Sequence, residues 1–536
     1  MRSRIIAGAV AAIATAALLA GCTSHGSTST STASTKAGPT SATFNLYQHP
    51  QSFNPLKASQ GAEVLTEELV FDNLVQVKPD FTFEPRLASS WQMSSDGLTW
   101  TFHLDKGLKW SDGQAFSSKD VLWTFNTMAD PKVGSAYASK FANVVGYSDE
   151  KSGAATTMSG LTAPDDNTVV FKFTTASPGF LASIAQGASM LILPEHVLGS
   201  HDKTQLLNDP WFTDPAVGMG PYTMTKFVPD QEVDLTKNKN FREKVGIDNV
   251  YLKMLTSDVA EAQLQTGELD LAQVAPADLT AVQAISGVNV NSAASPGFLR
   301  IVANDTKFPA PVRQALLQGI DRKTLIKTIY GGKADLVNSS FLTKWAIPSG
   351  LDTYSYSASK AKAALTAAGF DFSKTYTFEW VAGTADRDQA ITVILQEWNA
   401  LGVKVQAKQV DGATQLSDIK SKAYDFTFSG GGTYTLDPAS SLAFLTCANA
   451  YPAGGNVGYY CNPAFDAAVA KAQSTVKQSD SAPLWQAAAK IENKDVAEIW
   501  LYNPQTVWAT SSKLKGFQPY GDFTNVFADA YKWTVN

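Results

Sequence analysis

Hydrophobic and polar positions along the chain predict a mixed succession of strands and helices from about residue 44 onward. Residues 98–104 alternate apolar and polar side chains with period two, as a half-buried strand does. The Asp96-Gly97 turn just before them predicts a β-hairpin. Ser118 precedes an apolar stripe of helical spacing, so we expect it to cap a helix.

The same reasoning assigns the other elements. Further strands are expected at 44–47, 75–77, 168–173, 376–382, 403–410 and 424–428. Further helices are expected at 63–74, 311–320, 322–330, 358–368, 386–400, 462–475 and 481–494. We find no internal repeat. Strands and helices mixed over a chain of this length indicate lobes of α/β or α+β type.

The first 22 residues follow a different pattern. Arg2 and Arg4 precede an apolar run from residue 5 to residue 20, and Leu-Ala-Gly then leads to Cys22. A positive start, an apolar centre and small residues are the anatomy of a secretory signal, and the run is short for a membrane span. Leu-Ala-Gly-Cys also resembles the bacterial lipobox. We therefore expect residues 1–21 to be removed and Cys22 to be lipidated; an ordinary signal peptide is the alternative.

Composition describes the rest of the chain. Residues 22–42 are mostly Ser, Thr, Ala and Gly, which cannot bury enough apolar surface to order, so we expect a flexible tether.

Without residues 1–21 the 536-residue chain keeps 515, enough for two or more domains. No later apolar run reaches the ~18 residues of a membrane span. The formal charge of −6 becomes −8 without Arg2 and Arg4 and offers no basic footprint for nucleic acid.

Two cysteines remain near the C-terminus. Cys447 and Cys461 lie 14 residues apart, and outside the cytoplasm such a pair favours a disulfide. Closing a loop of that length contributes about 3 kcal/mol in the chain-entropy model. Two buried free thiols are the alternative. Zinc is not favoured, because no Cys-x-x-Cys and no neighbouring histidine accompany the pair.

An ordered series of motifs resembles the extracellular solute-binding proteins of family 5, the peptide/nickel class that feeds ATP-driven importers. The strongest stretch is residues 91–104, followed by Trp110-Ser111-Asp112-Gly113 and Asp120-Val121. Further matches are VGMGPY at 217–222, LQTGELD at 264–270, VRQALLQGIDR at 312–322, Asp437-Pro438 and residues 456–466. The resemblance runs from about residue 44 to the end of the sequence.

The resemblance implies an α/β fold with two lobes, a periplasmic-binding-protein-like clamp of type II. It is the large peptide-binding variety, in which the N-terminal lobe carries an extra domain. The implied N-terminal lobe is 43–300 with the extra domain at about 85–205, the C-terminal lobe is 301–502, and 503–536 returns to the N-terminal lobe. Such a clamp closes on its ligand by hinge motion and breaks no bond. We therefore expect no catalytic residue, no metal and no cofactor.

Several motif residues have structural explanations. We expect Gly218 and Gly220 to supply backbone freedom at a bend. Arg313, Asp321 and Arg322 are expected in ion pairs on a helix surface or between lobes rather than in contact with a ligand.

Two candidate ligand contacts follow the strand expected at 376–382. In peptide-binding relatives a basic residue there receives the peptide carboxylate. Arg387 lies within about one position of that place, on the first turn of a helix whose free N–H groups also favour anions. A solvent-facing Arg387 flanked by Asp386 and Asp388 is the alternative. Trp380 is the candidate aromatic wall, with a buried core Trp as its alternative.

The other candidates lie in and after a three-glycine run. Tyr434 stands where relatives carry an aspartate for the peptide α-amine, and a neutral phenol cannot pair with an ammonium as a carboxylate does. Asp437 is a possible substitute. Gly431 and Gly432 allow the backbone to approach a ligand closely; a flexible surface loop is the alternative.

Together these features predict the substrate-binding lipoprotein of an ABC importer, not an enzyme. We expect a monomer, anchored through Cys22 to the extracytoplasmic face of the cell membrane, that captures oligopeptides by lobe closure and delivers them to the permease. An oligosaccharide binder is the first alternative. A metal-chelate binder is less favoured, because the C-terminal half contains no histidine. A lipoprotein that only mediates interactions is a third class.

An enzyme of the penicillin-binding class is not favoured. Ser-x-x-Lys occurs at 357–360 and at 474–477. Neither Ser-Asp-Asn nor Lys-Thr-Gly, which accompany that motif in such enzymes, is present.

Overall fold

The computed structural model describes residues 38–57, 61–79, 82–185, 190–295, 297–432, 437–438, 445–520 and 525–536. The expected signal segment, Cys22 and most of the expected tether lie outside these residues. Residues 39–536 form one compact unit. Within the described ranges, no helix combines the length and the apolar character that a membrane crossing requires.

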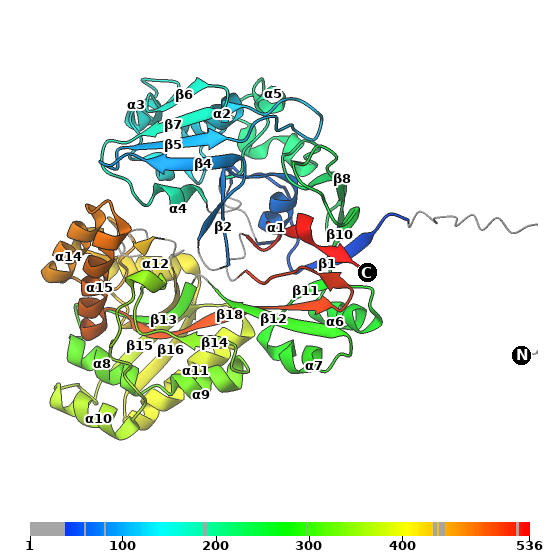
Figure 1. Ribbon diagram of the computed structural model, residues 1–536. Coiled ribbons are helices and arrows are strands. Elements are labelled where there is room, and N and C mark those ends of the chain that lie inside the picture. Colours follow the sequence, from blue (N-terminus) through cyan, green and yellow to red (C-terminus); the bar gives the residue numbers. More distant parts are fainter. Residues whose placement is uncertain are drawn as a thin grey trace, which may run out of the picture. The chain divides into compact units, whose positions relative to one another are not determined.

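A mixed sheet of twelve strands runs through the described part of the chain (Figure 1). Its strands are β1 (Ser41–Leu46), β8 (Tyr222–Val228), β9 (Glu232–Lys237), β10 (Asn249–Met254), β11 (Leu271–Val274), β12 (Val288–Ala294), β13 (Gly297–Ala303), β14 (Ala334–Leu336), β15 (Thr375–Val381), β16 (Lys404–Val410), β17 (Phe426–Gly432) and β18 (Ile499–Ser511). The order is β16-β15-β17-β13-β18-β11-β1-β10-β9-β8, and β12 and β14 also pair with β18.

Strand β18 joins the two halves of this sheet. Its second part pairs with β11 and β12, and its first part pairs with β13 and β14. The successive residues Trp500, Leu501 and Tyr502 on β18 are each 0% exposed, as expected for a strand covered on both faces. The lobe limits expected after residues 300 and 502 fall inside β13 and β18.

A second, antiparallel sheet has the order β4-β5-β7-β6. Its strands are β4 (Ala88–Met93), β5 (Thr99–Leu104), β6 (Leu161–Asp165) and β7 (Thr168–Lys172). The helices around it are α2 (Ser118–Ala129), α3 (Tyr147–Ser152), α4 (Phe180–Ile184) and α5 (Glu195–Leu198), all in the blue-to-green upper part of Figure 1. Trp100, Phe102 and Leu104 are buried on alternate positions of β5, which confirms the period-two prediction.

The cap of α2 is Ser117, so the prediction of Ser118 is wrong by one residue. The Ser117 hydroxyl accepts a hydrogen bond from the Lys119 N–H, and the Asp120 carboxylate accepts one from the Ser117 N–H. This reciprocal capping box needs an acidic residue three positions after the cap, and Asp120 meets that condition only for Ser117. Ser118 is buried and donates to the Asp165 carbonyl.

Seven of the remaining helices agree with the predicted windows to within a few residues, whereas α6, α7 and α12 had no predicted window. The α-helices are α1 (Gly61–Val70), α6 (Ser257–Thr266), α7 (Leu279–Gln283), α8 (Ala310–Gln318), α9 (Arg322–Ile329), α10 (Ala358–Ala367), α11 (Ala385–Leu401), α12 (Gly412–Ser421), α14 (Pro463–Gln473) and α15 (Gln478–Asp495). Two small two-stranded sheets join β2 (Val75–Val77) to β3 (Phe83–Pro85) and β19 (Leu514–Lys515) to β20 (Thr534–Val535).

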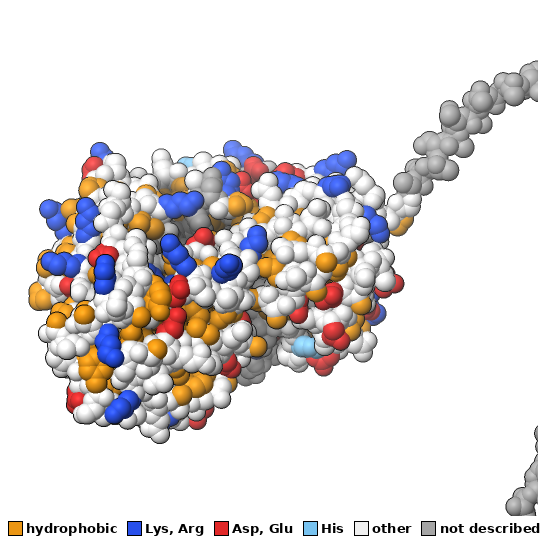
Figure 2. All heavy atoms as spheres, turned by 90° about the horizontal axis from the view of Figure 1, so that it is seen from below, with side chains coloured by type: hydrophobic (Ala, Val, Ile, Leu, Met, Phe, Trp, Pro, Cys, Tyr) orange, Lys and Arg blue, Asp and Glu red, His pale blue; other side chains and the backbone are white. Residues whose placement is uncertain are grey.

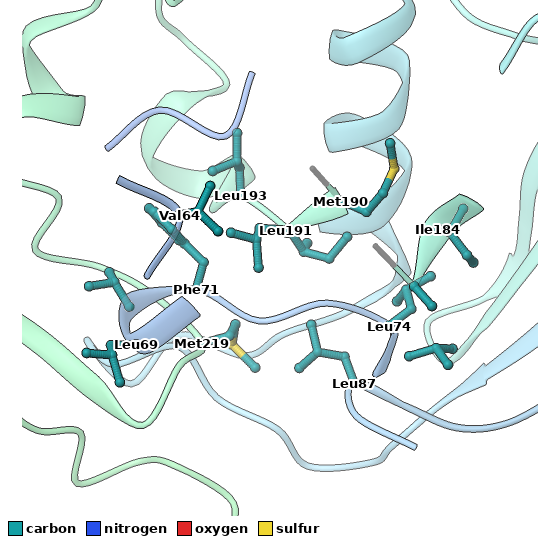
Figure 3. Close-up of a cluster of buried hydrophobic side chains, with 14 of the residues drawn as sticks. Val64, Leu69, Phe71, Leu74, Leu87, Ile184, Met190, Leu191, Leu193 and Met219 are labelled. Atoms are coloured by element: carbon teal, nitrogen blue, oxygen red, sulfur yellow. The ribbon is translucent and has the colours of Figure 1, made fainter. Parts of the chain in front are cut away.

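The largest hydrophobic core surrounds α1 (Figure 3). Val64 and Leu69 of α1 meet Leu191 and Leu193 from the segment after α4, and Met219 from the bend before β8. A second core lies between the sheet and helices α8 to α11, where Trp398 is fully buried. On the face seen in Figure 2, charged side chains of both signs and hydrophobic side chains are interspersed.

Glycine stands at positions 218 and 220 because the chain there passes close to α1. The predicted reason, backbone freedom at a bend, is wrong. Neither residue has a positive φ. A Cβ on Gly218 would lie 1.9 Å from the Val70 carbonyl oxygen, and one on Gly220 would lie 2.5 Å from that of Leu69. The Gly220 N–H also donates to the Val70 carbonyl at 2.8 Å. These glycines therefore let the bend close onto the end of α1.

The two arginines of α8 and α9 are buried within the C-terminal half, so the prediction that they lie on a helix surface or between the lobes is wrong, although Arg313 does form an ion pair. Arg313 and Arg322 are each 4% exposed. Arg313 donates to the carbonyls of Phe308, Asp495 and Val496 and pairs with Asp305 at 3.3 Å. Both guanidinium groups thus hold loops of the C-terminal half together.

Candidate functional site

Arg387 lies on the first turn of α11, directly after the loop that follows β15. It is half-buried, and its side chain folds back over that loop at Gly383. A Cβ placed on Gly383 would lie 2.9 Å from the Cδ of Arg387 and 3.1 Å from its Nη1. Among the described residues its guanidinium has no hydrogen bond and no ion pair within 4 Å. A half-buried guanidinium without a partner is the strongest sign of a ligand contact in this region.

The two aspartates beside Arg387 have other partners. The Tyr330 hydroxyl donates to Oδ2 of Asp386 at 2.6 Å. The Trp380 indole Nε1 donates to Oδ1 of Asp388 at 3.0 Å. Neither carboxylate lies within ion-pair distance of Arg387, although both are its direct neighbours in the chain. The positive charge of Arg387 is therefore not cancelled locally.

Tyr330 and Tyr502 form the buried floor of this cluster. Their ring centroids are 5.0 Å apart, and Tyr502 lies on β18 between Leu299 of β13 and Leu336 of β14. Burial raises the pKa of both hydroxyls, and Asp386 raises each further, whereas Arg387 opposes the rise at Tyr502. Both hydroxyls therefore keep their protons at neutral pH, and the Tyr330 hydroxyl donates to Asp386, whereas that of Tyr502 has no hydrogen-bond partner among the described residues.

Trp380 is held at the edge of the second core. It is half-buried on β15, its ring is 6.4 Å from Phe378 in an edge-on arrangement, and its indole N–H is fixed by Asp388.

The glycine run ends strand β17. Gly431 and Gly432 pair with Phe298 and Gly297 of β13, so these two glycines lie in the sheet. The other edge of β17 pairs with β15 only at Phe426 and Thr427. From Phe428 to Gly432 that edge has no strand partner among the described residues. An unpaired edge of this kind is a template for a further extended chain.

Asp437 lies against the second sheet's domain. A Cβ on Gly179, at the start of α4, would lie 2.7 Å from Oδ2 of Asp437. Tyr434 and Cys22 lie outside the described residues. Cys447 and Cys461 are joined by a disulfide, with their Cα atoms 4.5 Å apart.

The arrangement can bind an extended, anionic molecule without chemical change. An unpartnered guanidinium stands at the N-terminus of α11, where backbone N–H groups add positive potential, and β17 offers main-chain groups. No cluster of three or more His, Cys, Asp or Glu side chains suitable for a metal occurs in the described ranges.

Tyr330 and Tyr502 were not among the residues expected at the site. Neither belongs to a local motif: Tyr330 ends a helix, and Tyr502 sits in an apolar strand from a distant part of the sequence. The sequence pointed to this region only through Trp380 and Arg387, which lie on either side of the loop before α11.

Known proteins share this architecture. Residues 82–452 match the description "Bacterial extracellular solute-binding proteins, family 5 Middle". A Brucella abortus protein, provisionally named as an ABC transporter peptide-binding protein, is 28% identical over 486 residues, covering 87% of this chain and 87% of that protein. The dipeptide-binding protein of Pseudomonas aeruginosa is 26% identical over 496 residues, covering 88% and 90%.

A solved structure extends the likeness to the fold. The ABC transporter substrate binding protein CtaP from Listeria monocytogenes superimposes with a TM-score of 0.78 at 23% identity, over 92% of this chain and 99% of that chain. The expected fold class, α/β with two lobes, is confirmed. The chain belongs to family 5 of the bacterial extracellular solute-binding proteins.

Proposed function

We propose that this protein is the substrate-binding subunit of an ABC importer and that it captures peptides outside the cell. Family membership supports the binding of a solute, and the names of the Brucella and Pseudomonas relatives favour peptides as the ligand class. Two observations carry the proposal: the unpaired edge of β17 from Phe428 to Gly432, and the unpartnered Arg387, which follows the loop after β15, the strand that pairs with β17.

The edge and the arginine together suit a peptide chain. An extended peptide adds to a free strand edge through main-chain hydrogen bonds, which are the same for every sequence. Residues 428–432 provide such an edge, and no atom lies within 4 Å of a Cβ placed on Gly430, which leaves room there for a ligand side chain. Arg387 would receive the terminal carboxylate through two charge-assisted hydrogen bonds. Recognition of this kind tolerates many side chains, so the proposed substrates are mixed oligopeptides.

The cellular setting belongs to the same proposal. The Leu-Ala-Gly-Cys motif supports an acyl anchor on Cys22 and a place on the outer face of the cell membrane, with residues 23–42 as the tether. The protein would act as a monomer, close its lobes on the ligand and dock on the permease. Tyr434 and Asp437 stand as proposed contacts for the other end of the ligand.

Native mass spectrometry of protein purified from its own host tests the ligand class. We expect a co-purified mixture of short peptides and an acyl mass on Cys22. A ladder spaced by one hexose would instead favour the oligosaccharide alternative, which the replacement of the amine-binding aspartate by Tyr434 keeps open.

Calorimetry of Arg387→Ala tests the site. The probe is a synthetic tetrapeptide mixture with random side chains, prepared as the free acid and as the C-terminal amide. We expect the substitution to weaken binding of the free acid roughly 10- to 100-fold, in line with the ~1.5–3 kcal/mol of a hydrogen bond to a charged group, and to leave the amide unchanged.

A matched control is Lys323→Ala, which removes an exposed positive charge from α9. If Arg387→Ala binds acid and amide as the wild type does, Arg387 is not the carboxylate receptor.

A further inference from the structure

We propose that Tyr330 and Trp380 are positioning residues that keep Arg387 available for the ligand by holding Asp386 and Asp388 away from it. The inference rests on the proposed function, because it takes Arg387 as the receptor of a carboxylate. It adds the reason why an arginine between two aspartates in the sequence keeps an uncompensated charge.

A carboxylate on the adjacent residue is a strong competitor for the guanidinium. It is present at a high effective concentration, since it is tethered to the same turn of helix. Adjacent residues of a helix do not face each other, so the contact forms only when a freed carboxylate turns toward the guanidinium, where it occupies N–H groups that the peptide carboxylate would use. Unless Asp386 and Asp388 are engaged elsewhere, Arg387 has its own neighbours as ligands.

Tyr330 engages Asp386. It is 2% exposed, ends helix α9, and packs its ring against Tyr502, so its position is fixed from two sides. Its hydroxyl donates to Asp386 at 2.6 Å. Because burial keeps this hydroxyl protonated, the contact persists across the neutral range.

Trp380 engages Asp388 from the other side. Its indole N–H donates at 3.0 Å from strand β15, which is itself paired along its length with β16. Gly383 completes the arrangement, because the absence of a side chain there lets the Arg387 stem fold back over the loop. The two aspartates stay in the first turn of α11, where their negative charges interact favourably with the positive N-terminal end of the helix dipole.

Tyr330→Phe tests the inference, because it deletes only the hydroxyl and keeps the ring packing. Asp386 then becomes free to pair with Arg387. We expect affinity for the free-acid tetrapeptide mixture to fall about tenfold and affinity for the amide mixture to stay constant. The double variant Tyr330→Phe/Asp386→Asn should restore wild-type affinity for the acid, because a neutral amide does not compete for the guanidinium.

Tyr376→Phe is the matched control. Tyr376 is also buried in the C-terminal half, and its hydroxyl donates to the Asp371 carbonyl, which belongs to another loop. This variant should bind both mixtures as the wild type does. Thermal unfolding of each variant reports whether the fold is intact.

The outcomes separate the inference from the proposed function. Equal loss of acid and amide binding in Tyr330→Phe, or no rescue by Asp386→Asn, would show a merely structural role and overturn the inference. If Arg387→Ala abolishes the preference for the acid while Tyr330→Phe keeps it, only the inference fails. If the wild type itself does not distinguish acid from amide, the proposed role of Arg387 fails.

Discussion

Arg322 shows how a single buried side chain can connect several segments. Its guanidinium donates to the carbonyls of Val337, Thr353 and Trp500 and to the Asn338 side chain, at distances from 2.6 to 3.1 Å. No carboxylate lies within ion-pair distance among the described residues, and burial lowers its pKa to about 10. The charge is therefore compensated by carbonyl dipoles alone, and Arg322 joins α9 to β18.

We predict that Arg322→Ala lowers the free energy of unfolding by about 3 kcal/mol or more. The substitution leaves several buried carbonyls without a donor, and each unsatisfied group costs about 1–3 kcal/mol. Denaturant unfolding followed by tryptophan fluorescence measures the change. Lys323→Ala, one residue further on the exposed face, should change stability by less than about 0.5 kcal/mol. Comparable stabilities for the two variants would contradict the assigned role of Arg322.

At the scale of elements, helix α1 and the bend before β8 lie far apart in the chain and touch closely. The bend touches the last carbonyls of α1 at Gly218 and Gly220, and a hydrogen bond from Gly220 satisfies one of them. This contact continues into the core of Figure 3, to which both Leu69 of α1 and Met219, between the two glycines, belong. The bend thus acts as a cap on the C-terminal end of α1.

We predict that Gly218→Ala destabilises the protein by about 1–3 kcal/mol, the usual range for overpacking a tight contact. The added methyl group would lie 1.9 Å from backbone, which cannot rotate away as a side chain does. Thermal unfolding measures the shift. Gly412→Ala, where no atom lies within 4 Å of the added Cβ, should be neutral or stabilising by up to about 1 kcal/mol. If Gly218→Ala and Gly412→Ala unfold at the same temperature, the space at Gly218 is not as tight as the contact with α1 indicates.

Local patterns accounted for the elements but not for their long-range partners. The alternation in β5 and the helical spacing of α8 to α11 could be read from the sequence, because burial on one face leaves a period. The pairing of β18 with four other strands could not, because a strand buried on both faces has no period. Arg387 could be named from the sequence because the family resemblance and the start of a helix both pointed to its position, whereas Tyr330 and Tyr502 required the tertiary fold.

At the scale of the whole molecule, buried acids link stability to pH. Burial raises the pKa of Glu150 to about 7, with Asp130 adding to the rise, and neither Glu150 carboxylate oxygen has a hydrogen-bond partner among the described residues. Burial also raises the pKa of Glu492 to about 7, against hydrogen bonds from Ser340 and Ser339. One of these acids lies beside the second sheet and the other in the C-terminal half.

We predict that stability falls as the pH rises from about 4.5 to 7. In this range the unfolded chain, with ordinary glutamate pKa values of 4.5, loses protons that the folded protein keeps, so each group contributes a slope of about −1.4 kcal/mol per pH unit. Glu150→Gln should remove one such contribution. Urea unfolding at pH 5, 6 and 7 measures the slope, and Glu268→Gln, an exposed site, is the control. A slope unaltered by Glu150→Gln would show that Glu150 titrates alike in both states.

The position of β18 in the chain governs the order in which the protein can acquire its structure. Residues 499–511 are the last strand of the large sheet to leave the ribosome, yet β11 and β13 both depend on them for a neighbour. Non-local pairing of this kind closes late and slowly. The nascent chain therefore stays without its completed scaffold until synthesis is nearly over, a delay that would suit the export that the proposed function requires.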